Sequence, residues 1–452
     1  MGKNLLTPEE IAIAERCITL SLEKGAEKAR VTLTKSNLEL CGMLDGELDK
    51  VTHALDRCIT VALFAGGRFG TFSTNRLEEK ELEGFLESAI GTVRMLAPDP
   101  CRDLPSPERT AKNAAEGGEL GLYDSSIEDL TFEQRLSMAR RSSCWKRKES
   151  IEKGFRLLSE EGEYSDSTSD TLILDTNGLR CRQYETSFEI GYEVTLEDLS
   201  GNLISGYWWD ERTFLKDLLE PLESCSETAI RRAAAHIGPK KHEGGTMNLV
   251  VESECASKLV SPLLSALGGY ALQQKNSFLD GKIGEKVFGD NVTLIDFPTK
   301  GGAYGSRLFD SEGVATKEGP IIENGVVKTS FLNTYIAAKM GLSPTVEDAS
   351  RPKLLPVGGC RNLEDVLEKV GEGILVTGFN GGNSSAATGN FSYGIEGFRF
   401  ENGKIVHPVR EMLITGNFID LWNHLLVTAD DARCAMSKII PTLAFGEVSI
   451  SG

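Results

Sequence analysis

The sequence is poor in the positive charge that a nucleic-acid-binding protein needs. Its 452 residues hold 49 Lys and Arg against 67 Asp and Glu, a formal net charge of -18. The groups of adjacent basic residues are short, as at 140–141, 146–148 and 240–241. Because contacts with phosphates depend on clustered cations, the composition argues against direct binding to DNA or to an anionic membrane surface.

Long apolar runs are also missing. No stretch reaches the about 18 apolar residues of a membrane-spanning helix, so no span is expected. The first twenty residues, MGKNLLTPEEIAIAERCITL, lack the apolar core and cleavage site of a signal peptide. The 10 cysteines form no C-x-x-C pair and no zinc-finger spacing, a pattern typical of reduced thiols. We therefore expect a cytoplasmic protein.

Familiar catalytic motifs are absent as well. There is no P-loop, no G-x-S-x-G elbow and no H-E-x-x-H among the five histidines. His236 and His242 could meet across a turn, but their surroundings are typical of a linker. Ser143 and Lys146 fit the short pattern S-x-x-K without convincing companions, which leaves an independent hydrolase as a remote alternative.

The pattern of apolar residues and turn signals predicts an α+β protein. We expect N-terminal α/β sandwich-like units and a C-terminal domain of mainly antiparallel β structure. The predicted divisions are an α+β domain over 1–97, a Pro-rich linker or arm over 98–130, a central α+β unit over 131–237 and the β-rich domain over 245–452.

Local signals support this division. The stretch Thr7-Pro8-Glu9-Glu10 and the pair Thr131 and Gln134 each predict a helix start with a capping box. Asn-Gly pairs at 177–178, 324–325 and 402–403 lie between β-rich runs and predict hairpins, since both residues tolerate positive φ.

The stretch from Gly378 to Val409 is rich in glycine, asparagine and serine and lies deep in the chain. Its motifs TGFNGGN (377–383) and TGNFS (388–392), with the segments 401–421, 276–298 and 49–89, resemble the TldD/PmbA family, also labelled modulator of DNA gyrase. The resemblance covers most of the chain in order, and no single motif carries it alone.

The family has two branches. TldD-like members carry a His-Glu-x-x-x-His helix and a further ligand near the C-terminus. The corresponding stretch here, 248–272, reads as a strand followed by a helix, holds Glu252 and Glu254, and contains no histidine. Cys434 lacks the Gly-Lys-x-Gly-Gln context of the TldD branch and reads as a structural thiol. The resemblance thus implies the TldE (PmbA) branch, with no metal in this chain.

That branch implies a function. The chain is expected to be the non-catalytic subunit of a TldD/TldE heterodimeric zinc metallopeptidase, which cleaves unfolded or small peptides in peptide-antibiotic maturation and antitoxin turnover. Zinc is expected in the TldD-like partner, and this chain would complete the chamber, with a homodimer possible when it is alone. The alternative is a stand-alone peptide-binding or regulatory protein, an indirect modulator of gyrase without a peptidase role.

The glycine-rich stretch has two interpretations. It can be a structural crossover between strands, because glycine permits turns and close backbone approach. It can also line the chamber and bind a peptide backbone through the polar side chains of Asn380, Asn383, Asn390 and Ser392. We name these four residues as the candidate substrate-binding site.

Overall fold

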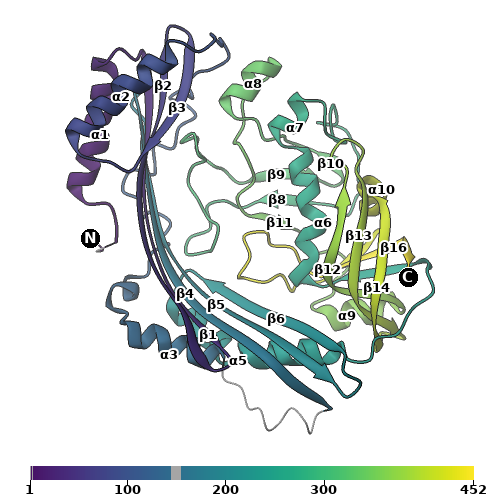
Figure 1. Ribbon diagram of the computed structural model, residues 1–452. Coiled ribbons are helices and arrows are strands. Elements are labelled where there is room, and N and C mark those ends of the chain that lie inside the picture. Colours follow the sequence, from purple (N-terminus) through teal and green to yellow (C-terminus); the bar gives the residue numbers. More distant parts are fainter. Residues whose placement is uncertain (1, 3, 144–153) are drawn as a thin grey trace. The chain divides into compact units, whose positions relative to one another are not determined.

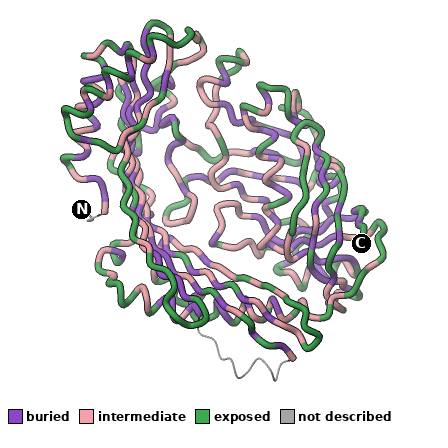
Figure 2. The backbone as a smooth tube through the Cα atoms, viewed as in Figure 1, coloured by how far each residue is buried: buried purple, intermediate pink, exposed green. Residues whose placement is uncertain are grey.

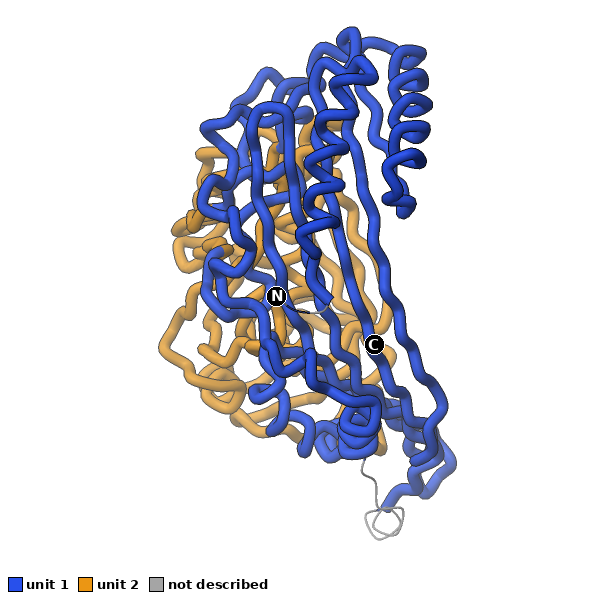
Figure 3. Tube along the Cα trace, turned by 90° about the vertical axis from the view of Figure 1, so that its left-hand side faces the viewer, with its two compact units in different colours: residues 1–233, 299–316, 333–346 blue, residues 234–298, 317–332, 347–452 orange. Residues whose placement is uncertain are grey.

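The chain forms two compact units in a computed structural model that describes residues 2, 4–143 and 154–452 (Figures 1 and 3). Unit 1 contains residues 1–233, 299–316 and 333–346, and unit 2 contains residues 234–298, 317–332 and 347–452. Within the described residues, no helix is both long and apolar enough to cross a membrane.

Unit 1 is built on one antiparallel sheet of long strands, in the order β3-β2-β1-β4-β5-β6. The strands are β1 (Lys28–Leu44), β2 (Glu47–Ala65), β3 (Arg68–Thr74), β4 (Phe155–Asp175), β5 (Arg180–Asp198) and β6 (Leu203–Arg212). Strands from the predicted ranges 1–97 and 131–237 therefore hydrogen-bond side by side, because β1 pairs with β4 from Arg30 to Leu44.

Helices cover one face of this sheet. They are α1 (Pro8–Glu23), α2 (Glu79–Val93), the short 3-10 helix η1 (Ser125–Asp129), α3 (Phe132–Ser142) and α5 (Leu215–Ala235). Both predicted capping boxes are present, at Thr7 and Thr131. Leu33, Val61 and Leu86 are fully buried members of the apolar core between the sheet and the first two helices.

The proline-rich range 98–130 runs as an extended arm along the first half of β5. In this range, which the structure describes throughout, η1 is the only helix and no strand forms. The backbone N–H groups of Arg182 and Tyr184 donate to the carbonyls of Ala114 and Gly117. The arm thus satisfies the edge of β5 where β6 does not reach.

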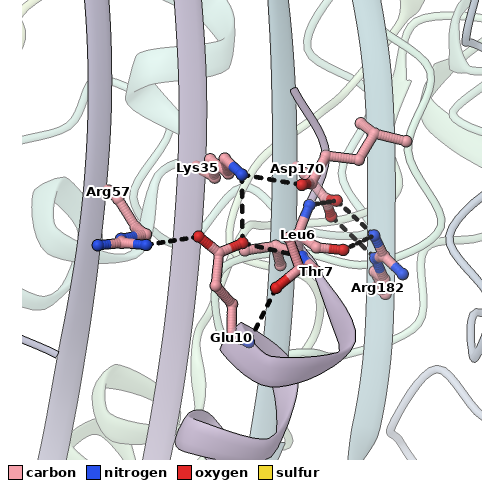
Figure 4. Close-up of polar contacts among 8 residues, drawn as sticks. Leu6, Thr7, Glu10, Lys35, Arg57, Asp170 and Arg182 are labelled. Atoms are coloured by element: carbon pink, nitrogen blue, oxygen red, sulfur yellow. Dashed lines mark hydrogen bonds and ion pairs between the residues drawn. The ribbon is translucent and has the colours of Figure 1, made fainter. Parts of the chain in front are cut away.

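A buried charge network ties the start of α1 to the sheet (Figure 4). The Leu6 N–H donates to Asp170 at 2.9 Å, and the Arg182 guanidinium pairs with the same carboxylate at 2.5 Å. Lys35, which lies on β1, donates to the Glu10 carboxylate at 3.2 Å. Lys35 and Asp170 are directly opposite residues of β1 and β4, so the network crosses the sheet in one row.

Glu10 is the acidic centre on the helix side of this network. Burial opposes its ionisation, but hydrogen bonds from the Thr7 N–H, Arg57 and Lys35 outweigh burial and lower the pKa of its carboxyl. The capping box of α1 and the ion pairs of the sheet therefore share one carboxylate.

Unit 2 contains a closed sheet in the order β14-β13-β12-β7-β16-β15, in which β14 also pairs with β16. Its strands are β7 (Gly245–Val251), β12 (Gly373–Ser384), β13 (Asn390–Glu401), β14 (Lys404–Asn417), β15 (Leu425–Thr428) and β16 (Leu443–Ser451). Only β7 and β12 run parallel among these pairs. The expected α+β fold with a mainly antiparallel C-terminal domain is confirmed.

Four short strands and several helices complete the chain. A separate, smaller sheet is formed by the strands β8 (Leu294–Asp296), β9 (Gly319–Glu323), β10 (Val326–Val327) and β11 (Pro352–Leu354). The helices are α6 (Ser253–Ala266), α7 (Gly269–Gln273), α9 (Leu363–Val370) and α10 (Phe418–Asn423), and α8 (Thr334–Met340) belongs to unit 1.

The Asn-Gly turns form as predicted at two of three positions. Asn324 and Asn402 both have positive φ, at 49° and 51°, and each precedes a glycine that also has positive φ. At the third turn only Gly178 has positive φ. There the Asp175 carboxylate accepts the N–H groups of Asn177 and Leu179, and this side-chain turn replaces the expected two-residue geometry.

Aromatic side chains fill the interior of unit 2. Trp422 and Phe445 are fully buried with ring centroids 5.4 Å apart, and Phe391 and Phe418 pack at 4.8 Å. Burial alternates along the strands of both units (Figure 2). In a pleated strand this alternation assigns successive side chains to opposite faces.

Candidate functional site

The four predicted site residues lie on the hairpin of β12 and β13. Asn383 and Ser392 are directly opposite in the antiparallel register, and Asn380 lies three residues before Asn383 on the same strand. Asn390 is the first residue of β13, and all four residues are exposed. The structure therefore brings them together on one element, with their amides and hydroxyl open to solvent.

Asn390 already has partners within the chain. The Asn417 side-chain amide donates to the Asn390 side-chain oxygen at 2.9 Å and to the Thr388 carbonyl at 2.8 Å. Asn417 also caps α10, since its side chain accepts the Ile419 N–H. The Asn390 side chain thus holds the loop against the start of a helix, which gives it a structural contact.

The opposite face of β13 is apolar. Phe391, Tyr393 and Ile395 are buried, and Phe391 stacks on Tyr393 with ring centroids 5.5 Å apart. The ring of Phe379 on β12 meets Tyr393 edge-on at 5.8 Å. The hairpin therefore has a rigid aromatic face and a polar face that carries Asn390 and Ser392.

Glycine is needed where β12 bulges. The pairing with β13 shifts register between Phe379 and Gly382, and Gly381 and Gly382 have φ of 128° and 100°. A Cβ atom on Gly382 would lie 2.1 Å from the Ser392 carbonyl oxygen. These glycines therefore serve close backbone approach, and the structural interpretation of the stretch holds at this position.

The outer edge of β12 is open next to these residues. β7 pairs with β12 only at Ile374–Val376, and the Glu252 N–H then donates to the Val376 carbonyl at 3.0 Å. α6 begins at the next residue. Along Gly378–Ser384, no strand and no isolated bridge of the described chain occupies the side opposite β13.

The segment 248–272 forms the predicted strand and helix, β7 and α6. Pro262 lies inside α6, which continues as one helix to Ala266. Glu252 is the residue before the helix and Glu254 lies in its first turn, where the helix dipole favours acidic groups. In the residues that the structure describes, no cluster of three or more His, Cys, Asp or Glu side chains is arranged to hold a metal ion.

Four histidines contact groups of their own neighbourhood. His53 pairs with Glu39, His242 and His407 contact backbone carbonyls, and His424 contacts the Asp420 carbonyl and Glu447. The fifth, His236, lies 3.2 Å from the Thr377 hydroxyl and stacks on Phe398 at 4.6 Å. Thr377 is the first residue after the β7–β12 ladder, so this imidazole packs at the base of the open edge.

Two other sequence candidates have different outcomes. Cys434, which we expected to be a structural thiol, is exposed. It lies in the segment between β15 and β16, outside the helices and strands. The Ser143 hydroxyl donates to the Ala139 carbonyl at 3.0 Å within its own helix turn. Cys144 to Lys146 lie outside the described residues.

The sequence reading missed an acidic face on the sheet of unit 1. Glu163, Glu185, Glu189 and Glu211 share the face opposite the helices, because the register places them on the same side of β4, β5 and β6. Burial raises the pKa of Glu163, Glu185 and Glu189. The alternating run from Glu185 to Glu193 is the signal that could have revealed this face.

A small pocket of about 50 Å³ adjoins the acidic face within unit 1. Most of its side chains are small or hydroxylated, and it is lined by Leu122, Ser167, Ser169, Glu185, Thr186, Ser187, Thr213, Ala303, Tyr304 and Gly305. The Ser187 hydroxyl donates to Glu211 at 2.5 Å. Burial and the neighbouring Glu211 raise the pKa of the Tyr304 hydroxyl.

Comparisons with known proteins match nearly the whole chain. Family models of the PmbA/TldA metallopeptidase central and C-terminal domains match residues 125–237 and 244–452. Metalloprotease PmbA of Escherichia coli O157:H7 is 25% identical over 444 residues, which cover 97% of this chain and 96% of that protein.

Two solved structures have a similar fold. One, from Bacteroides thetaiotaomicron VPI-5482 and described as a candidate modulator of DNA gyrase, is 37% identical, has a TM-score of 0.93 and covers 99% of this chain and 100% of that one. The other, TldE from Thermococcus kodakarensis, is 21% identical with a TM-score of 0.82 and covers 97% of this chain and 100% of that one, which is a likeness of fold alone.

Proposed function

Because the chain belongs to the PmbA/TldD family, we propose that it is the non-catalytic, TldE-like subunit of a cytoplasmic zinc peptidase. In this proposal a TldD-like chain supplies the zinc and the catalytic glutamate. This chain completes the chamber and helps to hold unfolded or small peptides. The single observation that carries the proposal is the β7–α6 segment, which supplies two carboxylates and no imidazole.

The chemistry of zinc supports this reading of β7 and α6. Zinc peptidases hold the metal with imidazole and carboxylate ligands and leave one position open for water. Asn248 to Leu272 contain no histidine, and Glu252 and Glu254 lie at a helix start, where the helix dipole favours acidic groups. We infer that a metal site in the assembled enzyme uses residues of the partner.

The open edge of β12 supports a role in peptide binding. An extended peptide can add to such an edge as a further strand, so main-chain hydrogen bonds supply affinity for many sequences. The free backbone of Gly378–Ser384 offers these groups, and Asn380 and Asn383 add exposed amides beside them. The proposal therefore assigns sequence-tolerant binding to this edge.

The first test measures metal content and peptide cleavage for this chain alone and for the complex with a TldD-like chain. We expect a metal-free, inactive single chain and an active complex with about one zinc per heterodimer. Stoichiometric zinc and cleavage by the isolated chain would overturn the proposal. Absence of any complex would favour the stand-alone binding or regulatory protein.

The second test addresses the β12 edge. In the active complex, Asn383→Ala with Ser392→Ala should lower kcat/KM for an unfolded peptide by about tenfold, because two hydrogen-bonding side chains are lost. Ser200→Ala, an exposed serine on the β5–β6 turn, is the control and should change nothing. Unchanged cleavage in the double variant would remove these residues from the site.

A further inference from the structure

The sheet of unit 1 has an open position at Gly191, on the face that its helices do not cover. In the register of the strands, Gly191 of β5 lies between Glu163 of β4 and Trp209 of β6. A Cβ atom placed on Gly191 would meet no atom within 4 Å beyond those of its own chain neighbours. A large side chain on either side of this open position leaves room for a ligand group between them.

Carboxylates surround the open position. Glu163 is opposite Gly191, and Glu189 and Glu193 lie two positions away along β5 in either direction. Because side chains alternate between the faces of a strand, the three carboxylates share the face of the open position. Among the residues that the structure describes, none of the three has an ion-pair or side-chain hydrogen-bond partner. We name this arrangement the Gly191 site, which consists of Gly191, Glu163, Glu189, Glu193 and Trp209.

The electrostatics of these carboxylates show that the site lacks a cation. Burial, together with the negative charges of Glu211 and Glu163, raises the pKa of the Glu189 carboxyl. Burial and Glu161 also raise the pKa of Glu163, although Lys50 opposes them. A cation bound in the Gly191 site would relieve this repulsion, because a nearby opposite charge favours the ionised carboxylate.

A buried hydroxyl lies beside the Gly191 site. Ser165 is 8% exposed, is directly opposite Glu189 and shares the face of Glu163. Its hydroxyl makes no hydrogen bond with any part of the chain that the structure describes. Since buried polar groups are as a rule hydrogen-bonded, this hydroxyl indicates that a ligand supplies the missing partner.

Aromatic side chains border the site on the β6 side. Trp209 is opposite Gly191, and Tyr207, which is 66% exposed, is opposite Glu193. Aromatic rings attract ammonium and guanidinium groups, and carboxylates bind the same groups through charge-assisted hydrogen bonds. In the described part of the chain no cluster of three or more carboxylates is arranged to hold a metal ion. The combination therefore fits an organic cation better than a metal ion.

We propose that the Gly191 site binds the side chain of an arginine or lysine in an extended peptide segment. The open position accommodates the aliphatic stem beside Trp209, and Glu163 and Glu189 pair with the charged group. The net charge of -18 attracts a basic segment toward the chain. This inference concerns binding by the single chain and does not depend on the proposed peptidase role.

Fluorescence anisotropy with the isolated chain tests the class of ligand. The probe is a labelled peptide of glycine and serine with one central arginine, and the matched peptide carries citrulline, which has the same shape without the charge. At low ionic strength the arginine peptide should bind at least about tenfold more tightly. Equal binding of the two peptides would overturn the proposal. So would displacement of the arginine peptide by an equal concentration of Mg²⁺, because it would show a general attraction of cations to an acidic surface.

Removal of charge tests the location. Glu163→Gln with Glu189→Gln should weaken binding of the arginine peptide at least about tenfold, since both paired carboxylates are lost. Glu227→Gln with Glu318→Gln removes the same charge from exposed positions outside this face. That control should stay within about threefold of the native chain, because distant exposed charges are screened. An equal loss in both double variants, or none in the first, would contradict the proposal.

Filling the open position tests the geometry without a change of charge. Gly191→Leu places a side chain where the ligand stem would lie, and it should weaken binding of the arginine peptide at least about tenfold. The melting temperature should stay the same or rise, because glycine weakens the interior of a strand. Native affinity in a folded Gly191→Leu variant would show that the peptide does not enter the Gly191 site.

Discussion

The two large sheets of this protein are held together in different ways. The sheet of unit 1 is open, and its helix side carries charged residues that are buried in pairs, such as Asp170 with Arg182 and Asp166 with Arg135. The main sheet of unit 2 closes through β14 and β16, and buried aromatic side chains such as Trp422 pack against it. Antiparallel strands are common to both, but the interactions that fix their register differ.

This difference determines how each unit responds to damage. A buried ion pair stabilises little by itself, because desolvation offsets the attraction, yet removal of one partner leaves an uncompensated charge. An apolar core loses stability in proportion to the atoms removed and the cavity left behind. We therefore expect that loss of one buried charge destabilises unit 1 strongly, whereas the destabilisation of unit 2 grows with the number of core atoms removed.

The largest effect is expected at Arg182. Arg182→Met keeps most of the side-chain volume. It removes the cation that pairs with the fully buried Asp170 carboxylate, which keeps the hydrogen bond from the Leu6 N–H. We expect a loss of about 3 to 5 kcal/mol in the free energy of unfolding, measured by urea denaturation. A loss below about 1 kcal/mol would show that the buried pair is not what holds unit 1.

Two controls separate charge from packing. Arg156→Met removes the partner of Glu197 on the same two strands, but this pair is largely exposed and should cost less than about 1 kcal/mol. Adding Asp170→Asn to Arg182→Met removes the buried charge while keeping an acceptor for the Leu6 N–H. The double variant should therefore regain much of the lost stability.

A smaller effect is expected where unit 2 closes. Ile414 on β14 lies opposite Ile450 on β16, and both are buried. Ile414→Val should cost about 0.5 to 1.5 kcal/mol by the same denaturation assay, since one methylene group is lost. Ile405→Val, at an exposed position of the same strand, should change nothing measurable. A loss above about 3 kcal/mol would show that unit 2 is as sensitive to a single substitution as unit 1 is expected to be.

The smallest effect is expected on the acidic face, where its sign depends on pH. Burial raises the pKa of Glu185 above its unfolded value, so its ionised form destabilises the folded state at neutral pH. Glu185→Gln should raise the melting temperature slightly at pH 7. The gain should vanish near pH 4 and below, where the carboxyl is protonated in both states. The exposed Glu318→Gln is the control, and a lower melting temperature at pH 7 would contradict the prediction.

Local signals predicted the elements better than their assembly. The capping boxes at Thr7 and Thr131 and the Asn-Gly turns depend on neighbouring residues, and they appear as expected or with one substituted geometry. The pairing of β1 with β4 joins residues more than a hundred positions apart. No periodicity within either strand encodes such a partner, so the continuous sheet of unit 1 was not predictable.

The candidate site shows the same limit. The Gly/Asn/Ser composition correctly indicated turns and close backbone approach at Gly382, a local property. The open edge of β12 depends on where β7 ends and α6 begins, more than a hundred residues earlier in the chain. The role of Asn383 and Ser392 in binding stays a prediction that cleavage assays must test.

The anchor of α1 carries a consequence for synthesis. The Leu6 N–H and carbonyl bond residues 164 and 176 positions later, so they wait for the chain to be made. At about 5 to 20 residues per second, Arg182 is added to the chain roughly 9 to 35 s after Leu6. A one-residue slip of β4 would turn Asp170 to the other face. The start of α1 can therefore form these bonds only after β4 and β5 have paired in the correct register. Docking of α1 is thus a late step in the folding of a newly made chain.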